Sequence, residues 1–241
     1  MVQVLQSIYK NWRRIELFPD KLPEALQSEL LMENVFYANL NARNKRFFEH
    51  RVLDFMETYT FVGREGVLIT DSLKLRIAAT AIQLTFGYRH YLFYKIDTIV
   101  VYPSSYFSPF GNQKHDGETN PKYKVVIFSL EHFEQGNAIA DDNLNLGLHE
   151  FTHAMHLSFM ATNNSSARYF KRHYRNLLSF MESRKEQRKL IEAGYVRDYA
   201  YENQYEFLAV LIEHFFETPE EFKVKLPEIY NHIKKILRIR F

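Results

Sequence analysis

Two histidines stand four positions apart in the segment His149-Glu150-Phe151-Thr152-His153. On a helix, residues four apart lie on the same face, so both imidazoles can reach one metal ion. Glu150 directly follows the first histidine, where its carboxylate can take a proton from a metal-bound water. The pattern predicts a hydrolytic zinc site with His149 and His153 as ligands and Glu150 as general base. The competing interpretation is a structural helix with two hydrogen-bonded histidines and a surface glutamate.

A catalytic zinc site needs a third protein ligand and leaves one position for water. The 241-residue chain contains no cysteine, so this ligand must be a histidine or an acid. His156 lies near the face of the two histidines, but three ligands from two turns of one helix rarely converge on a tetrahedral ion. We therefore expect His156 at the rim of the site or behind its ligands.

Better candidates lie in an almost wholly apolar segment, residues 201–217, which should form a buried helix. Its glutamates fall on one side of a helical wheel: Glu202, Glu206, Glu213 and Glu217. A buried glutamate needs a cation or hydrogen-bond donors. We predict Glu206 as the third metal ligand, and we expect Glu217, close to Pro219, to be exposed or ion-paired.

These segments resemble the Mlc titration factor A family of bacterial zinc peptidases, whose site is related to that of the anthrax lethal factor protease domain. The zinc helix of that family carries an Asn four residues before its first His, as Asn145 stands before His149 here. The downstream signature of the family is matched without a gap by Tyr199-Ala200, Glu206-Phe207-Leu208-Ala209-Val210, Glu213, Phe215-Phe216 and Pro219. The similarity covers about residues 45 to 220.

The resemblance implies a zincin-like fold and a gluzincin-type site in which His149, His153 and Glu206 bind one zinc ion. It implies Glu150 as general base and proton shuttle, and Tyr199 as hydrogen-bond donor to the oxyanion. Supporting places beside the ligands would belong to Glu213 and Asn145, and, from its position on the helix, to His156. In the family, Lys-Leu-Asp usually follows the zinc motif, so His156 here replaces an acid.

Two kinds of partner follow from the resemblance. The first is a peptide substrate, cleaved in an aminopeptidase-like manner. The alternative is a regulatory role, in which the protein binds and sequesters a transcriptional repressor of sugar uptake. A catalytically silent zinc protein is a third reading, which the intact ligands, base and tyrosine argue against.

Periodicity, proline and glycine predict the elements that must position these residues. We expect residues 23–58 to be helical in two pieces, and a further helix to run from Asp71 or Ser72 to Phe86. Another helix should contain the His149 motif and be capped by Asp142 or Asn143. The remaining helices are expected over 165–192, 200–217 and 227–238. Strands are expected over 98–102 and 122–128, with two strand-like stretches in 60–70 and a loop over 103–121. The order predicts a mainly helical α+β fold with a small sheet. We expect one domain over residues 1–241, with 1–58 as a helical part packed on it.

Composition excludes several other classes of protein. The formal net charge is only +2, and the basic clusters at 171–175 and 234–238 are short, so we expect no direct nucleic-acid partner. No stretch approaches the ~20 apolar residues of a membrane span. The start, residues 1–14, resembles a short amphipathic helix and has no signal-peptide core. Together with the absence of cysteine, these features predict a cytoplasmic protein without membrane attachment.

Overall fold

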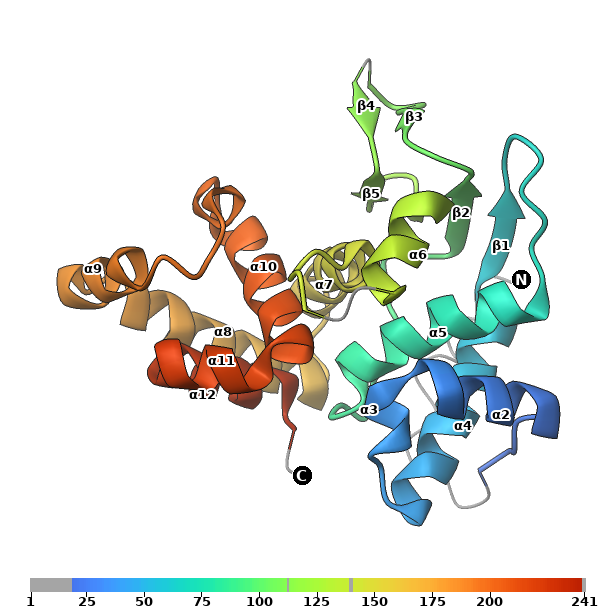
Figure 1. The fold of residues 1–241 in the computed structure, drawn as a ribbon, viewed down its shortest axis with the longest axis horizontal. Helices are drawn as coiled ribbons and strands as arrows, with labels where there is room; N and C mark the ends of the chain where they lie inside the picture. The colour runs from blue at the N-terminus through green and yellow to red at the C-terminus, as the bar shows by residue number, and fades with distance from the viewer. Residues whose placement is uncertain (1–18, 112, 139–140, 240–241) are drawn as a thin grey trace.

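The computed structural model describes residues 19–111, 113–138 and 141–239. Most of them lie in helices, and one small mixed sheet stands beside these helices (Figure 1), which confirms the mainly helical α+β prediction. The amphipathic helix expected over residues 1–14 lies outside the described residues. Among the helices of the described part, none has the length and apolar character needed to span a bilayer.

The main sheet has four strands in the order β1-β2-β6-β5. Three run parallel and β5 runs antiparallel at the edge; the strands are β1 (Thr60–Gly63), β2 (Thr98–Tyr102), β6 (Val125–Ser129) and β5 (Gly117–Asn120). Alternate residues of a strand point to opposite faces. Val101 and Phe128 accordingly join the main core, whereas Ile127 belongs to a small separate cluster with Val100 and Tyr106.

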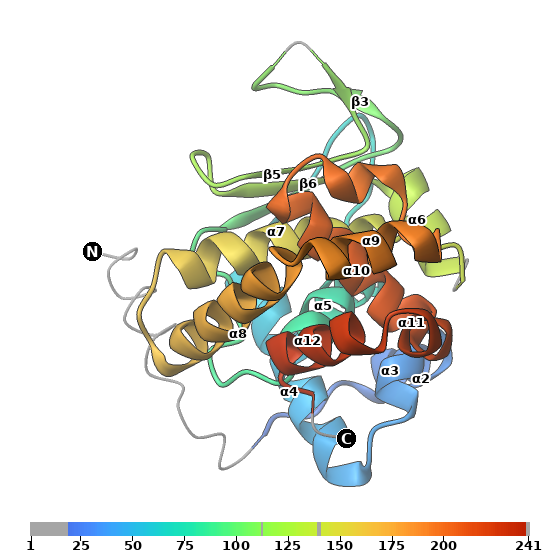
Figure 2. The ribbon, with the colours of Figure 1, turned by 90° about the vertical axis from the view of Figure 1, so that its left-hand side faces the viewer.

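Helix α7 (Leu146–Met160) lies in the middle of the molecule, between two groups of helices and beside the edge strand β5 (Figures 1 and 2). The first group comprises α2 (Glu24–Glu33), α3 (Val35–Ala38), α4 (Ala42–Thr58) and α5 (Asp71–Thr85). The second comprises α8 (Ser165–Met181), α9 (Arg184–Ala193), the 3-10 helix η1 (Asp198–Tyr201), α10 (Gln204–Glu217), α11 (Pro219–Lys225) and α12 (Pro227–Leu237). Helix α6 (Leu130–Ala138) packs against the α7 helix and the sheet.

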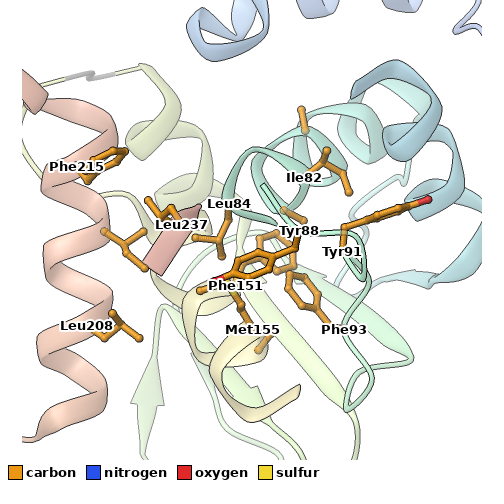
Figure 3. Packing of buried hydrophobic residues seen from close by; sticks show 14 of the residues in the cluster. Ile82, Leu84, Tyr88, Tyr91, Phe93, Phe151, Met155, Leu208, Phe215 and Leu237 are labelled. Atoms are coloured by element: carbon orange, nitrogen blue, oxygen red, sulfur yellow. The ribbon is translucent and has the colours of Figure 1, made fainter. Parts of the chain in front are cut away.

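The apolar side of α7 is anchored by Phe151 and Met155, neither of which has any exposed surface. The ring of Phe151 stacks on Phe93 at 5.4 Å between centroids and meets Phe55 and Phe128 edge-on. Figure 3 shows Phe151, Met155 and Phe93 within the packed interior. Because the buried side of the helix is fixed by large rings, its opposite side holds the two histidines of the motif in place.

Asparagine caps divide the expected helices differently from the prediction. Residues 23–58 form three helices instead of two, because the Asn34 and Asn41 side chains each accept a backbone N–H and start a new helix. The single helix expected over 165–192 breaks at Ser183 into α8 and α9. Asn203 accepts the N–H groups of Tyr205 and Glu206, so α10 begins at Gln204 and is preceded by η1.

Two predicted helix caps were wrong by a few residues. Thr70, and neither Asp71 nor Ser72, caps α5 by accepting the N–H of Leu73. At α7 the cap is Asn145, whose Oδ1 accepts the N–H of Leu148 at 2.9 Å, and neither Asp142 nor Asn143. A cap residue is the last one in extended geometry before the first helical turn, and sequence patterns locate it only to within a few positions.

The segment 103–121 is not the loop that its prolines suggest. It contains the small hairpin β3 (Tyr106–Phe107) and β4 (Lys114–His115), and then the edge strand β5. The strand expected over 122–128 begins only at Val125, and helix α6 follows it without having been predicted. In 60–70 only β1 is a strand, because Gly66 adopts a positive φ of 86° in a turn.

Candidate metal centre

Three ligand atoms from two helices converge at one point beside α7. The Oε2 atom of Glu206, on α10, lies 2.9 Å from His149 Nε2 and 3.3 Å from His153 Nε2. The two Nε2 atoms are 3.1 Å apart. One ligand atom from each of these residues lies within 4.8 Å of the others, so the three form a candidate metal site. The histidines belong to successive turns of α7, while Glu206 belongs to the first turn of α10.

The hydrogen bonds around His149 indicate which of its nitrogens faces the site. Its Nδ1 lies 2.7 Å from Oε1 of Glu213, a carboxylate that is only 1% exposed. The backbone N–H of Asn145 donates to the other oxygen of Glu213 at 3.0 Å. With Nδ1–H donated to a carboxylate, Nε2 is the nitrogen of His149 that faces the site, as metal-binding histidines require.

The charges at this point favour a cation. Burial alone would lower the pKa of His149, but hydrogen bonds to Glu206 and Glu213 and the charges of nearby carboxylates raise it to about 10. Burial likewise opposes the charged form of Glu206, yet its bonds to His149 and His153 hold its pKa well below the usual range. A divalent cation bound here would displace the proton that the raised pKa of His149 leaves on its ring, and a His-His-Glu set suits zinc with one position left open.

Glu150 lies on the same helix and is held by the edge strand. The Thr119 hydroxyl, on β5, donates to Glu150 Oε2 at 2.7 Å and lies 2.9 Å from its backbone oxygen. The strand approaches closely because residue 117 is glycine: a Cβ there would lie 2.6 Å from Leu146 Cδ1 and 2.8 Å from Glu150 Oε1. The carboxylate of Glu150 is thus fixed between the strand and the cleft, and is 6% exposed as a residue.

Tyr199 reaches the site from the short helix η1. Its ring lies 5.7 Å from that of His149, and the residue is 43% exposed. Burial, and then the charges of Glu206 and Glu202, raise the pKa of Tyr199 to about 12. The hydroxyl therefore keeps its proton at neutral pH and can donate a hydrogen bond.

A cleft of about 460 Å³ opens beside these residues, between the β4–β5 segment and η1. Its charged and polar lining includes Lys114, His115, Asp116, His132, Glu150, Arg197, Tyr199 and Glu213. The cleft gives a molecule the size of a short peptide access to His149 and Glu150.

The remaining predicted residues lie in other surroundings. His156 is 5% exposed and packs its ring against Phe170, Tyr174 and Tyr205, so it lies in an aromatic pocket and not among the three ligand atoms. Burial, and then the charge of His153, lower the pKa of His156 to about 4, so it is neutral at neutral pH.

The expectation for Glu217 was wrong. Its two carboxylate oxygens are buried, and neither has a hydrogen-bond partner among the described residues. Proximity to Pro219 suggested an exposed position, but α11 packs against α10 and Thr218 bonds to Asn143 in the loop before α7, so the oxygens of this acid are buried and form no ion pair within the described part of the chain.

Sequence reasoning missed three residues that support the site: Gly117, Thr119 and Arg197. A glycine inside a strand indicates the close approach of another backbone. Residues 117–120 were expected to be a loop, so Gly117 was not predicted to lie in a strand. Arg197 forms a two-point ion pair with Glu213, at 2.7 Å and 3.0 Å. No local pattern links these two residues, because the contact depends on how η1 packs on α10.

Comparison with known proteins identifies a family and a relative. A family model described as glucose-regulated metallo-peptidase M90 matches residues 9–238. An uncharacterized protein of Synechocystis sp. is 26% identical over 254 aligned positions, which cover 93% of this chain and 87% of that protein. The family match includes every residue of the candidate metal centre, from the Asn145 cap to Glu217.

Proposed function

Since the chain belongs to the glucose-regulated metallo-peptidase M90 family, which confirms the resemblance found in the sequence, we propose that it is a zinc-dependent peptidase of the gluzincin type. The observation that carries this proposal is the convergence of His149, His153 and Glu206 beside Glu150. Family membership makes the protein a metallopeptidase; the identity of the metal and the roles of the residues are our inference.

Zinc held by the three ligand atoms would supply a Lewis acid that activates water and polarises a peptide carbonyl. Glu150 is placed to accept a proton from the attacking water, since its carboxylate lines the cleft and Thr119 fixes its orientation. The same carboxylate then returns the proton to the amine that leaves.

Tyr199 is the donor for the negative charge that develops on the carbonyl oxygen. Its position beside His149 and its retained proton suit this role. Because the tyrosine is partly exposed, substrate can reach its hydroxyl without rearrangement of the core.

We propose aminopeptidase-like action on short peptides, in a zincin-like fold formed by a single domain. A cleft of about 460 Å³ has the size of a site for a short peptide segment. The alternative, sequestration of a transcriptional repressor, stays a prediction. The two proposals can be distinguished experimentally, because repressor binding should survive the loss of Glu150 and peptide cleavage should not.

The decisive experiment replaces Glu150 by Gln and measures both zinc content and peptide cleavage. We expect about one zinc per chain, as in the parent, and a fall in kcat of about 10²- to 10⁴-fold, the usual contribution of a general base. Glu192→Gln, at an exposed position on α9, is the control and should change neither. Cleavage at the parental rate by the Glu150 variant would exclude the mechanism. Amino-terminally blocked and free peptides, compared as substrates, test the aminopeptidase assignment.

A further inference from the structure

Arg197 contacts three segments that surround the metal centre. Its two terminal nitrogens donate to Glu213, from Nη2 to Oε1 at 2.7 Å and from Nη1 to Oε2 at 3.0 Å. Nη1 also donates to the backbone oxygen of Asn143, in the loop before α7. Arg197 itself immediately precedes η1, the short helix that carries Tyr199. One side chain thus joins α10, the start of α7 and the turn that holds the tyrosine.

Glu213 depends on this contact for its orientation. It is 1% exposed and receives four hydrogen bonds, of which the guanidinium donates two and His149 Nδ1 and the Asn145 N–H donate one each. A planar guanidinium fixes the plane of a carboxylate through two parallel bonds, which a lysine ammonium cannot do. With that plane fixed, Oε1 is held toward His149 and the imidazole ring is held in the orientation that points Nε2 at the site.

Tyr199 depends on the same residue for a different reason. The tyrosine is 43% exposed, so packing alone holds it weakly, and its position follows that of η1. Val196 and Ala200, on either side of Arg197 and Tyr199, are buried in the main core, and the guanidinium contacts with Glu213 and Asn143 add the polar anchor at the beginning of η1.

We propose that Arg197 is a positioning residue that couples the metal ligand His149, through Glu213, to the oxyanion donor Tyr199. This inference rests on the proposed peptidase function. It adds a residue outside both sequence signatures, and it assigns to one side chain the orientation of a metal ligand and of the oxyanion donor.

The test compares Arg197→Met and Arg197→Lys with Arg188→Met, an exposed arginine of α9 that serves as control. For Arg197→Met we expect the zinc dissociation constant, measured by competition with a chelating dye, to rise about 10- to 100-fold, as when other outer partners of ligands are removed. We expect kcat to fall more than KM rises, because Tyr199 acts mainly on charge that develops in the transition state. Arg197→Lys should restore only part of either property, and Arg188→Met should match the parent.

A nuclear magnetic resonance measurement separates positioning from a general loss of stability. The His149 Nδ1 proton, bonded to Glu213, should give a resolved signal that is lost or shifted in Arg197→Met. An unchanged signal together with unchanged zinc affinity in the folded variant would overturn the proposal. If Arg197→Met does not fold, Arg197→Lys decides: full recovery of parental zinc affinity and kcat would also overturn it. Zinc affinity and the proton signal are measured without peptide, so failure of the peptidase proposal would appear separately, as absent cleavage by the parent.

Discussion

At the scale of single residues, the reactive groups are each held by a second polar partner. His149 is oriented by Glu213, and Glu150 by the hydroxyl of Thr119. Such partners reduce the freedom of a ligand or base, so less ordering is needed when substrate binds. The arrangement explains why this face of α7 can carry buried polar groups in a largely apolar interior.

Glu217 contrasts with these residues, because it is buried without a hydrogen-bond partner among the described residues. Burial raises its pKa to about 8, and the charges of Glu213 and Asp142 add to this; the Asn145 amide and the Asn143 backbone lie near enough to lower it in part, but neither reaches hydrogen-bond geometry with the carboxylate. Between pH 4.5 and 8 the native protein therefore holds a proton here that the unfolded chain has released. Stability contributed by this proton is complete below pH 4.5 and is lost as the pH rises through 8.

We predict that Glu217→Met raises the free energy of unfolding at pH 8 by about 1 to 3 kcal/mol, the cost of an unpaired buried polar group. The gain should shrink as the pH falls toward 5, since the native glutamate is then protonated. Urea denaturation at the two pH values measures both quantities. Glu217→Gln removes the titrating group but keeps a polar one. Its free energy of unfolding should therefore lose the pH dependence due to residue 217 and rise by less than that of Glu217→Met. An equal effect of Glu217→Met at both pH values would contradict the assignment.

At the scale of elements, the distance between β5 and α7 decides whether Glu150 is correctly placed. Glycine at residue 117 permits the observed approach, because a Cβ there would displace the side chains of both Leu146 and Glu150. The edge strand is therefore part of the candidate active site as well as of the sheet.

We predict that Gly117→Ala lowers kcat about 100-fold or more, because a displacement of about 1 Å at a catalytic group costs on that order. Zinc content should be unchanged, since none of the three ligand atoms belongs to β5. Gly111→Ala is a matched control in the neighbouring hairpin, where a Cβ would meet nothing within 4 Å. Steady-state kinetics and metal analysis on both variants check this; parental activity in Gly117→Ala would show that the close approach is unimportant.

At the scale of the whole molecule, the candidate site joins the central helix α7 to the C-terminal helices. His149 and His153 belong to α7, and Glu206 belongs to α10. A metal that binds the folded state and not the unfolded chain stabilises the fold by mass action, by about 4 kcal/mol at a free concentration of 1,000 times Kd.

We predict that zinc at that concentration raises Tm by roughly 8 to 16 °C over the chelator-treated protein, from about 2 to 4 °C per kcal/mol for a chain of this size. Unfolding should remain a single transition, as expected if the chain is one domain. Differential scanning calorimetry with and without chelator measures the shift. The Glu206→Gln variant should show much less zinc dependence, and an equal shift in that variant would place the metal elsewhere.

The sequence by itself determined the local part of this site. The spacing of His149 and His153 sets both on one face of any helix, and the apolar residues around Glu206 require a buried helix and a partner for that acid. Helical periodicity depends on neighbours within a few positions. The candidate ligands could therefore be predicted without knowledge of the tertiary structure.

Only the tertiary structure decided which distant groups meet. Thr119 lies 31 positions from Glu150, and Glu213 lies 64 positions from His149. Arg197 precedes η1 and Glu217 ends the next helix, α10. The guanidinium of Arg197 is paired with a carboxylate, whereas the carboxylate of Glu217 accepts no hydrogen bond from the described residues. Hydrogen bonds of this kind form only at distances near 3 Å. They are set by the order of the strands and by the packing of α10 and η1 against α7, and no pattern of neighbouring residues encodes those distances.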